Sequence, residues 1–209
     1  MTAHVWHHEV INPAVEQTLE ALHARALLAG FYLAGGTGLA LQLGHRRSLD
    51  LDFFAPVPFN EEQLLQRLQL LPGFGLVSRD RQTLHVQIGG VRVSFLGYAY
   101  PVLFPFMPFL DVPVAAPKDI ACMKISAIAG RGTRRDFIDL FMVAEQEGLG
   151  ALCALFREKF AAANYSLVHV LKSLTYFDDA EREPMPHMLT PMSWEAVKRF
   201  FVEQAPALL

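Results

Sequence analysis

Apolar residues follow first a helical and then a strand-like spacing near the start of the chain. Residues 12–28 repeat apolar side chains at helical spacing up to a stop at Gly30. Residues 31–34 are continuously apolar, which predicts a short buried strand, and residues 37–43 are good helix formers with Thr37 as the expected N-cap. The pattern predicts a strand, a glycine turn and a short helix in succession.

Alternation of apolar and polar residues marks the next strands. Residues 49–54 alternate leucine or phenylalanine with aspartate, as a half-buried strand does. The residues expected to face the core are Leu49, Leu51 and Phe53, which leaves both aspartates on the other face. After a predicted surface helix at residues 60–70, residues 84–96 predict a hairpin that turns at Gly89-Gly90. The polar face of this hairpin carries His85, Gln87, Arg92 and Ser94.

Helical spacing dominates the chain after Pro117. The predicted helices cover residues 118–129, 134–146, 149–162, 165–176 and 193–204, with a loop at 178–191. The proline-rich stretch at 100–117 is expected to be irregular, with room for one short strand. The predicted organisation is an α/β (α+β) core in residues 1–116, followed by a helical region in residues 117–209.

Composition and charge narrow the class of protein. The chain has 209 residues, of which 52% are hydrophobic and 19% charged, which argues against disorder. A net charge of −3 gives no general attraction to nucleic acid or to anionic membranes. Cys122 and Cys153 form no CxxC pair and lie in apolar helical stretches, so buried reduced thiols are expected. Without an apolar span of about 20 residues, and without a signal-peptide plan at the N-terminus, a cytoplasmic protein with no membrane partner is predicted.

Two stretches carry residues suited to phosphate chemistry. In the first, two carboxylates at i and i+2, Asp50 and Asp52, can hold a hard divalent cation. The turn at Gly35-Gly36-Thr37 can offer backbone N–H groups to phosphate oxygens. Together they suit a metal-bound nucleoside triphosphate. The alternative is a solvated strand face beside an ordinary turn.

The second stretch, residues 118–139, concentrates positive charge in an otherwise acidic chain. Its cations are Lys118, Lys124, Arg131, Arg134 and Arg135. Asp136 and Asp139 are three residues apart on the same predicted helix. The patch could neutralise a triphosphate, or it could be a solvated helix in which Arg135 pairs with Asp139.

The two stretches together resemble a known family. GGTGLALQLGHRRSLDLDFF resembles the first motif of the AbiEii/AbiGii-type toxin nucleotidyltransferases, a branch of the DNA polymerase β-like nucleotidyltransferase superfamily. KDIACMKISAIAGRGTRRDFIDLF resembles that family's second motif, in the same order along the chain. The resemblance implies a nucleotidyltransferase-like mixed sheet with flanking helices, followed by a C-terminal helical bundle that contributes the second motif.

The resemblance also implies roles for individual residues. Asp50 and Asp52 would bind Mg²⁺ or Mn²⁺ and act in catalysis together with Lys124 and Asp139. The implied nucleotide-binding residues are Gly35, Gly36, Thr37, Arg46, Ser48, Lys118, Arg131 and Arg135. Lys118 competes with Lys124 for the place of the nucleotide-contacting lysine.

The implied reaction moves a nucleoside monophosphate from an NTP to an RNA, tRNA included, or to a protein hydroxyl. An antitoxin is an expected partner if the chain is the toxin of a toxin–antitoxin or abortive-infection system. One departure matters: the second hairpin strand carries Arg92 and Ser94 where many members of the superfamily have a third carboxylate. A catalytically degenerate nucleotide- or partner-binding module therefore stays open, as does a metal-dependent phosphohydrolase.

Overall fold

The computed structural model describes residues 5–208, and the chain divides after Ala116 into two compact units. Each unit has its own packing. Among the described residues, no helix combines the length and the apolar character needed to cross a membrane.

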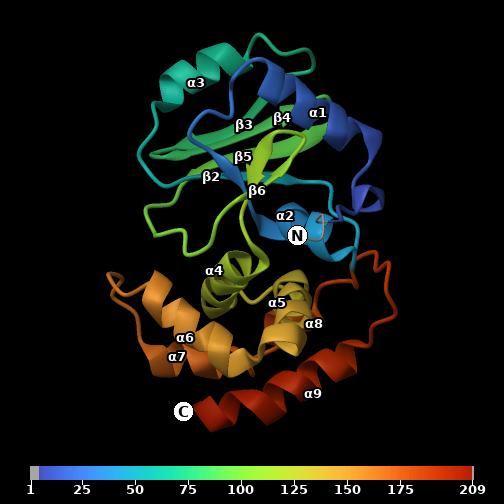
Figure 1. The fold of residues 1–209 in the computed structure, drawn as a ribbon, viewed down its shortest axis with the longest axis vertical. Helices are drawn as coiled ribbons and strands as arrows, with labels where there is room; N and C mark the ends of the chain where they lie inside the picture. Colours follow the sequence, from blue (N-terminus) through green and yellow to red (C-terminus); the bar gives the residue numbers. More distant parts are fainter. Residues whose placement is uncertain (1–4, 209) are drawn as a thin grey trace. The chain divides into compact units, whose positions relative to one another are not determined.

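The first unit is built on a mixed sheet. Within residues 5–208 the sheet has seven strands in the order β3-β4-β5-β2-β1-β7-β6 (Figure 1). Their bounds are β1 Tyr32–Leu33, β2 Leu51–Ala55, β3 Gly75–Asp80, β4 Thr83–Ile88, β5 Val91–Gly97, β6 Met107–Phe109 and β7 Val112–Val114. The central strand β2 is parallel to β5 and antiparallel to β1, while β3, β4 and β5 form an antiparallel meander. The predicted α/β class with a mixed sheet is confirmed.

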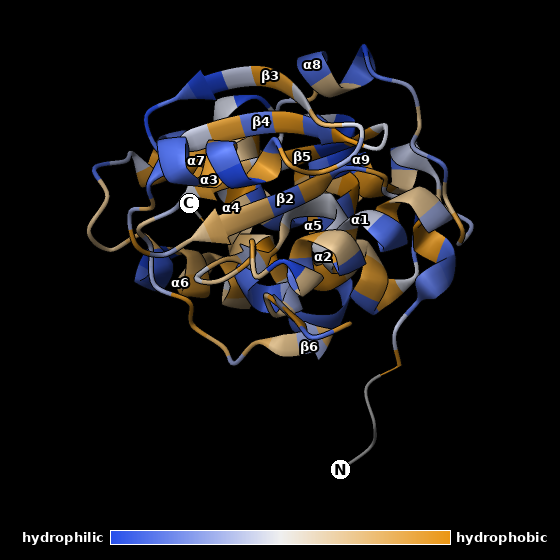
Figure 2. Cartoon of the chain, turned by 90° about the horizontal axis from the view of Figure 1, so that it is seen from above, coloured by the Kyte–Doolittle hydropathy of each residue, from blue (hydrophilic) through white to orange (hydrophobic). Residues whose placement is uncertain are grey.

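Short helices precede or connect the strands of this unit. They are η1 (His8–Val10), α1 (Pro13–Ala24), α2 (Gly35–Leu43) and α3 (Glu61–Leu68). Asparagine begins two of them: Asn12 accepts a hydrogen bond from Val15 N at 3.0 Å, and Asn60 accepts one from Gln63 N at 2.9 Å. Figure 2 shows hydrophilic and hydrophobic residues on both α1 and α3, as expected of helices that lay one side on a sheet.

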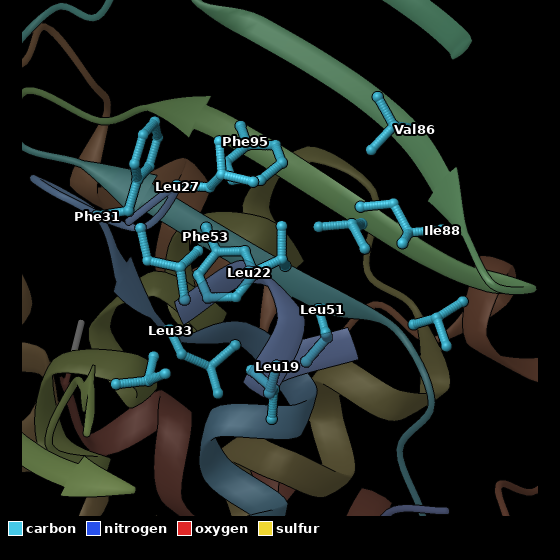
Figure 3. Packing of buried hydrophobic residues seen from close by; sticks show 14 of the residues in the cluster. Leu19, Leu22, Leu27, Phe31, Leu33, Leu51, Phe53, Val86, Ile88 and Phe95 are labelled. Carbon is cyan, nitrogen blue, oxygen red and sulfur yellow. The ribbon is translucent and has the colours of Figure 1, made fainter. Parts of the chain in front are cut away.

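The core of the first unit lies on one face of the sheet, under α1 and α3. Side chains from α1 and the central strands point toward one another there (Figure 3). Leu19, Leu33, Phe53 and Phe95 are fully buried. Successive residues of a strand point to opposite faces. In β2, β4 and β5, the residues that alternate with the buried ones therefore lie on the other face of the sheet. That second face carries the polar residues of the hairpin and Asp52.

Three details of this unit differ from the sequence prediction. Strand β2 begins at Leu51, and the prediction that Leu49 faces the core is wrong, since Leu49 is 48% exposed. Strand β3 was not predicted because this edge strand buries no side chain and so lacks an alternating pattern. The proline-rich stretch holds a two-stranded hairpin, β6 and β7, where one strand was expected. Pro108 is tolerated because β6 is the edge strand of the sheet.

The second unit is helical. Its elements are α4 (Pro117–Gly130), α5 (Arg134–Glu147), α6 (Leu149–Lys159), α7 (Leu167–Ser173), α8 (Asp178–Glu181), α9 (Trp194–Gln204) and η2 (Ala205–Leu208). Helix α4 packs against α5, α6 and α7. The predicted loop at 178–191 contains the short helix α8, and the predicted helix at 165–176 is confined to α7.

Both cysteines are buried in the helices of the second unit. Cys122 lies in α4 and Cys153 in α6, and both thiols are free. Burial raises the pKa of Cys122 to about 12 and that of Cys153 to about 11. The expectation of buried, reduced thiols agrees with this environment.

Candidate active site

The start of α2 is shaped around the Asp52 carboxylate. Gly35 is the first residue of the helix and has φ +61°, a left-handed conformation that favours glycine. A Cβ at this position would lie 2.8 Å from Asp52 Oδ2. The antiparallel pairing of β1 and β2 fixes this approach, and Ala34 N donates to the Asp52 carbonyl at 3.1 Å. Only glycine fits here, for reasons of both backbone and space.

Gly36 makes a second close approach, to the guanidinium group of Arg46. A Cβ at Gly36 would collide with Arg46 Nη2 and lie 3.3 Å from Ser48 Oγ. Arg46 is only 2% exposed, and its Nη1 donates to the Arg47 carbonyl at 3.0 Å. A buried cation therefore lies beside the first turn of a nine-residue helix, whose N–H groups already favour an anion.

Thr37 anchors the loop that carries Asp50, and the prediction that it is the N-cap of α2 is wrong. The N-cap is Ala34, and Thr37 is 1% exposed within the first turn. Its hydroxyl lies 2.8 Å from Ser48 Oγ and donates to the Asp50 carbonyl oxygen. The first unit thus brings together all the residues of the first motif named from the sequence: Gly35, Gly36, Thr37, Arg46, Ser48, Asp50 and Asp52.

The two aspartates differ in their surroundings. Asp50 Oδ1 lies 3.5 Å from Arg92 Nε, but the side chains are 38% and 78% exposed, so water screens this pair. Asp52 lies within β2, beside Ser94 of β5 in the parallel register. Among residues 5–208 no group of three or more His, Cys, Asp or Glu side chains could hold a metal ion by itself. Two carboxylates still suit Mg²⁺, which takes one or two protein carboxylates together with water and substrate phosphate oxygens.

In the second unit, Lys124 lies between two aspartates. Its Nζ is 2.8 Å from Asp136 Oδ1 and 2.7 Å from Asp139 Oδ2, and the exposed fractions of the three side chains are 10%, 4% and 0%. Burial raises the pKa of Asp136, but the charge of Lys124 and hydrogen bonds from Lys124 and Thr133 outweigh it, so the pKa lies below its ordinary value. Arg131 is more distant, 3.8 Å from Asp136, and its side chain is 74% exposed, so water screens this second pair.

The other cations of the second motif are spread out. Lys118 pairs with Glu147 at 2.8 Å, and Arg135 is exposed. Arg134 donates to the Ala180 carbonyl at 2.9 Å and lies over the Trp194 ring at 4.9 Å. Since Arg134 joins α5 to α8 and α9, its role is packing within the second unit.

One pair on the polar face was not anticipated from the sequence. His85 Nδ1 of β4 lies 3.1 Å from Ser94 Oγ of β5, and the two residues are directly paired in the antiparallel register. The alternation of polar residues on both hairpin strands could have indicated this contact, because His85 and Ser94 are equally distant from the turn at Gly89-Gly90.

The fold is that of nucleotidyltransferases. The chain resembles MenT4, the nucleotidyltransferase toxin of Mycobacterium tuberculosis H37Rv, with a TM-score of 0.50 and 19% identity over 95% of this chain and 87% of that one. It also resembles the crystal structure of a candidate nucleotidyltransferase from H. pylori, with a TM-score of 0.51 and 15% identity over 94% of this chain and 95% of that one.

Sequence comparison gives the family. Residues 66–207 match the family described as nucleotidyl transferase AbiEii toxin, type IV toxin–antitoxin system, and the chain belongs to that family. An uncharacterised protein of Aquifex aeolicus (strain VF5) is 36% identical over 191 residues, which cover 88% of this chain and 91% of that protein. The family and the enzyme class implied by the two motifs are confirmed, although the matched residues begin after the first motif.

Proposed function

We propose that this protein transfers a nucleoside monophosphate from an NTP to a hydroxyl group of an RNA or protein acceptor, with Mg²⁺ or Mn²⁺ held by Asp50 and Asp52. The observation that carries the proposal is the packing of Gly35 against the Asp52 carboxylate, next to Gly36 and the buried Arg46. Carboxylate oxygens and anion-binding groups lie side by side there, as a metal-bound triphosphate requires.

Each group of the first unit has a part in this reaction. The N–H groups of the first turn of α2 and the Arg46 guanidinium would bind phosphate oxygens and orient the chain of phosphates. Ser48 and Thr37 would hold Asp50 in place through the contacts of the Thr37 hydroxyl. The metal ion, when bound, supplies positive charge to the phosphates and lowers the pKa of the acceptor hydroxyl. Catalysis on this account comes mainly from positioning and charge neutralisation.

We extend the proposal to the second motif on the ground of the family resemblance. Lys124 would contact the nucleotide, and Asp139, through its 2.7 Å ion pair, would fix the position of the ammonium group. Arg131 and Arg135, both exposed, and Lys118 would add positive charge for the triphosphate. An antitoxin partner follows from the family, and tRNA is one acceptor to test.

Transfer of a labelled phosphate tests this function. The protein is incubated with each α-labelled NTP, Mg²⁺ and a clarified cell lysate or bulk tRNA. We expect label in an RNA or protein band, its loss on adding EDTA, and its loss in Asp50→Ala and Asp52→Ala. Asp111→Ala, in the tight turn between β6 and β7, is the control that should retain transfer. Transfer that survives EDTA or both active-site substitutions would show the proposed site to be wrong.

One observation favours a second candidate, a nucleotide-binding module without turnover. Ser94 occupies the place beside Asp52 where a third carboxylate is expected. This module would bind an NTP in calorimetry and release no pyrophosphate, whereas the transferase would release pyrophosphate in step with acceptor labelling.

A further inference from the structure

The polar face of the sheet holds a proton-accepting group close to the proposed metal site. We propose that His85, acting through the Ser94 hydroxyl, accepts the proton of the attacking acceptor hydroxyl and so replaces the third strand carboxylate. This inference rests on the proposed nucleotidyl transfer. It assigns Ser94 a role as the link between the acceptor and His85.

Three adjacent strands place the groups in one row. Asp52 of β2 is level with Ser94 of β5, and Ser94 is level with His85 of β4. Neighbouring strands lie about 4.8 Å apart, so a substrate oxygen bound at Asp52 is within reach of the Ser94 side chain. His85 Nδ1 lies 3.1 Å from Ser94 Oγ, and the side chains of Asp52, Ser94 and His85 are half-buried. The residues next to them in sequence, Phe53, Phe95, Leu84 and Val86, are buried on the opposite face.

The chemistry of the pair differs from that of a carboxylate. A serine hydroxyl can pass on a proton but cannot keep one, while a neutral imidazole accepts a proton at its free nitrogen. The required tautomer carries its hydrogen on Nε2, so that Nδ1 accepts from the Ser94 hydroxyl.

The transfer exchanges one phosphorus–oxygen bond for another. The acceptor oxygen forms a bond to the α-phosphorus, and the bond from that phosphorus to the bridging oxygen breaks, so that pyrophosphate leaves with the electron pair. The acceptor proton moves to Ser94 Oγ while the Ser94 proton moves to His85 Nδ1. The imidazolium afterwards returns its proton to water.

Two substitutions separate proton acceptance from simple packing. His85→Asn keeps a hydrogen-bond acceptor near Ser94 but cannot take up a proton. Ser94→Asp supplies the carboxylate that the strand lacks. Gln87→Ala is the matched control. Gln87 is exposed and lies on the same strand and the same face as His85, but it pairs with Arg92 and not with Ser94.

The assay measures labelling of lysate acceptors by α-labelled NTP, with kcat, KM and calorimetric NTP binding for each variant. We expect His85→Asn and Ser94→Ala each to lower kcat about 100-fold or more, with NTP binding unchanged, and the double variant to be no worse than either. Adding Ser94→Asp to His85→Asn should restore kcat at least about tenfold, because a carboxylate acts as the proton acceptor in place of the histidine. Gln87→Ala should behave as the wild type.

The outcomes distinguish this inference from the function on which it rests. A wild-type kcat in His85→Asn overturns the inference. A low kcat in His85→Asn that is not raised by adding Ser94→Asp also overturns it, because His85 then acts in packing alone. Both results leave nucleotidyl transfer intact. Absence of any transfer by the wild type contradicts the proposed function and this inference together.

Discussion

Substituting Gly35 by alanine should damage the site through one added methyl group. The new Cβ would lie 2.8 Å from Asp52 Oδ2, so the carboxylate must move by several tenths of an ångström. The residue would also have to keep φ +61°, which costs an L-residue about 1–2 kcal/mol. Crowding of the new methyl group in a packed position should lower the free energy of unfolding by roughly 1–3 kcal/mol more.

Gly30→Ala separates these two effects. Gly30 has φ +82°, and nothing lies within 4 Å of a Cβ built there, so this variant carries the backbone strain without the collision. Denaturant unfolding of both variants should show Gly35→Ala to be less stable than Gly30→Ala by about 1–3 kcal/mol.

The same pair should separate in function. We expect Gly35→Ala to weaken Mn²⁺ binding, measured by electron paramagnetic resonance in the presence of an NTP, because Asp52 is displaced. Gly30→Ala should bind Mn²⁺ as the wild type does. Equal losses of stability in the two variants, together with unchanged Mn²⁺ binding in Gly35→Ala, would refute the packing of Gly35 against the carboxylate.

Three further predictions concern the second unit. Lys124→Met leaves Asp136 and Asp139 buried without their cation and should lower the free energy of unfolding by about 3–5 kcal/mol, measured by denaturant titration; a loss near zero would contradict the buried cluster. Because the pKa of Asp136 in the folded state is below its ordinary value of 3.8, its pairing contributes stability that is full above that value and is lost as the pH falls through the lowered pKa. Unfolding between pH 2 and 7 should therefore show this loss at the acid end in the wild type. In Lys124→Met, burial raises the pKa of Asp136, so the variant should instead gain stability as the pH falls and the buried carboxylate takes up a proton; identical pH profiles would contradict the ion pair. Cys122 and Cys153, with pKa values of about 12 and 11, should react with a thiol reagent at pH 8 only after unfolding, and rapid reaction of the folded protein would show that the thiols are accessible.

The sequence predicts those parts of the fold in which local pattern and tertiary packing agree. The hairpin of β4 and β5 follows from strict alternation around Gly89-Gly90, and both glycines have positive φ. Strand β3 was missed because an edge strand with exposed side chains has no apolar periodicity. The position of Leu49 was predicted wrongly because the alternation of residues 49–54 begins before the strand does. The pairing of β2 with β5 starts only at Leu51, and Leu49 is exposed.

The candidate site was predictable as a set of residue types but not as a set of contacts. Spacing indicates that Asp50 and Asp52 are near a glycine turn, and the structure places Asp52 against Gly35. Arg46 is buried against Gly36 because the loop after α2 folds back onto the start of that helix. The residue types in the loop do not predict this path. Long-range contacts of this kind are set by the tertiary fold.

Following both ends of the triphosphate in one reaction tests the central claim most directly. The wild type is given an NTP labelled at the α- and γ-phosphorus, with Mg²⁺ and lysate acceptors. We predict that the α label becomes bound to an acceptor while the γ label appears in pyrophosphate, and that both products disappear in Asp52→Asn. Release of the γ label as orthophosphate without acceptor labelling, or release of neither label by a protein that binds the NTP, would contradict nucleotidyl transfer at this site.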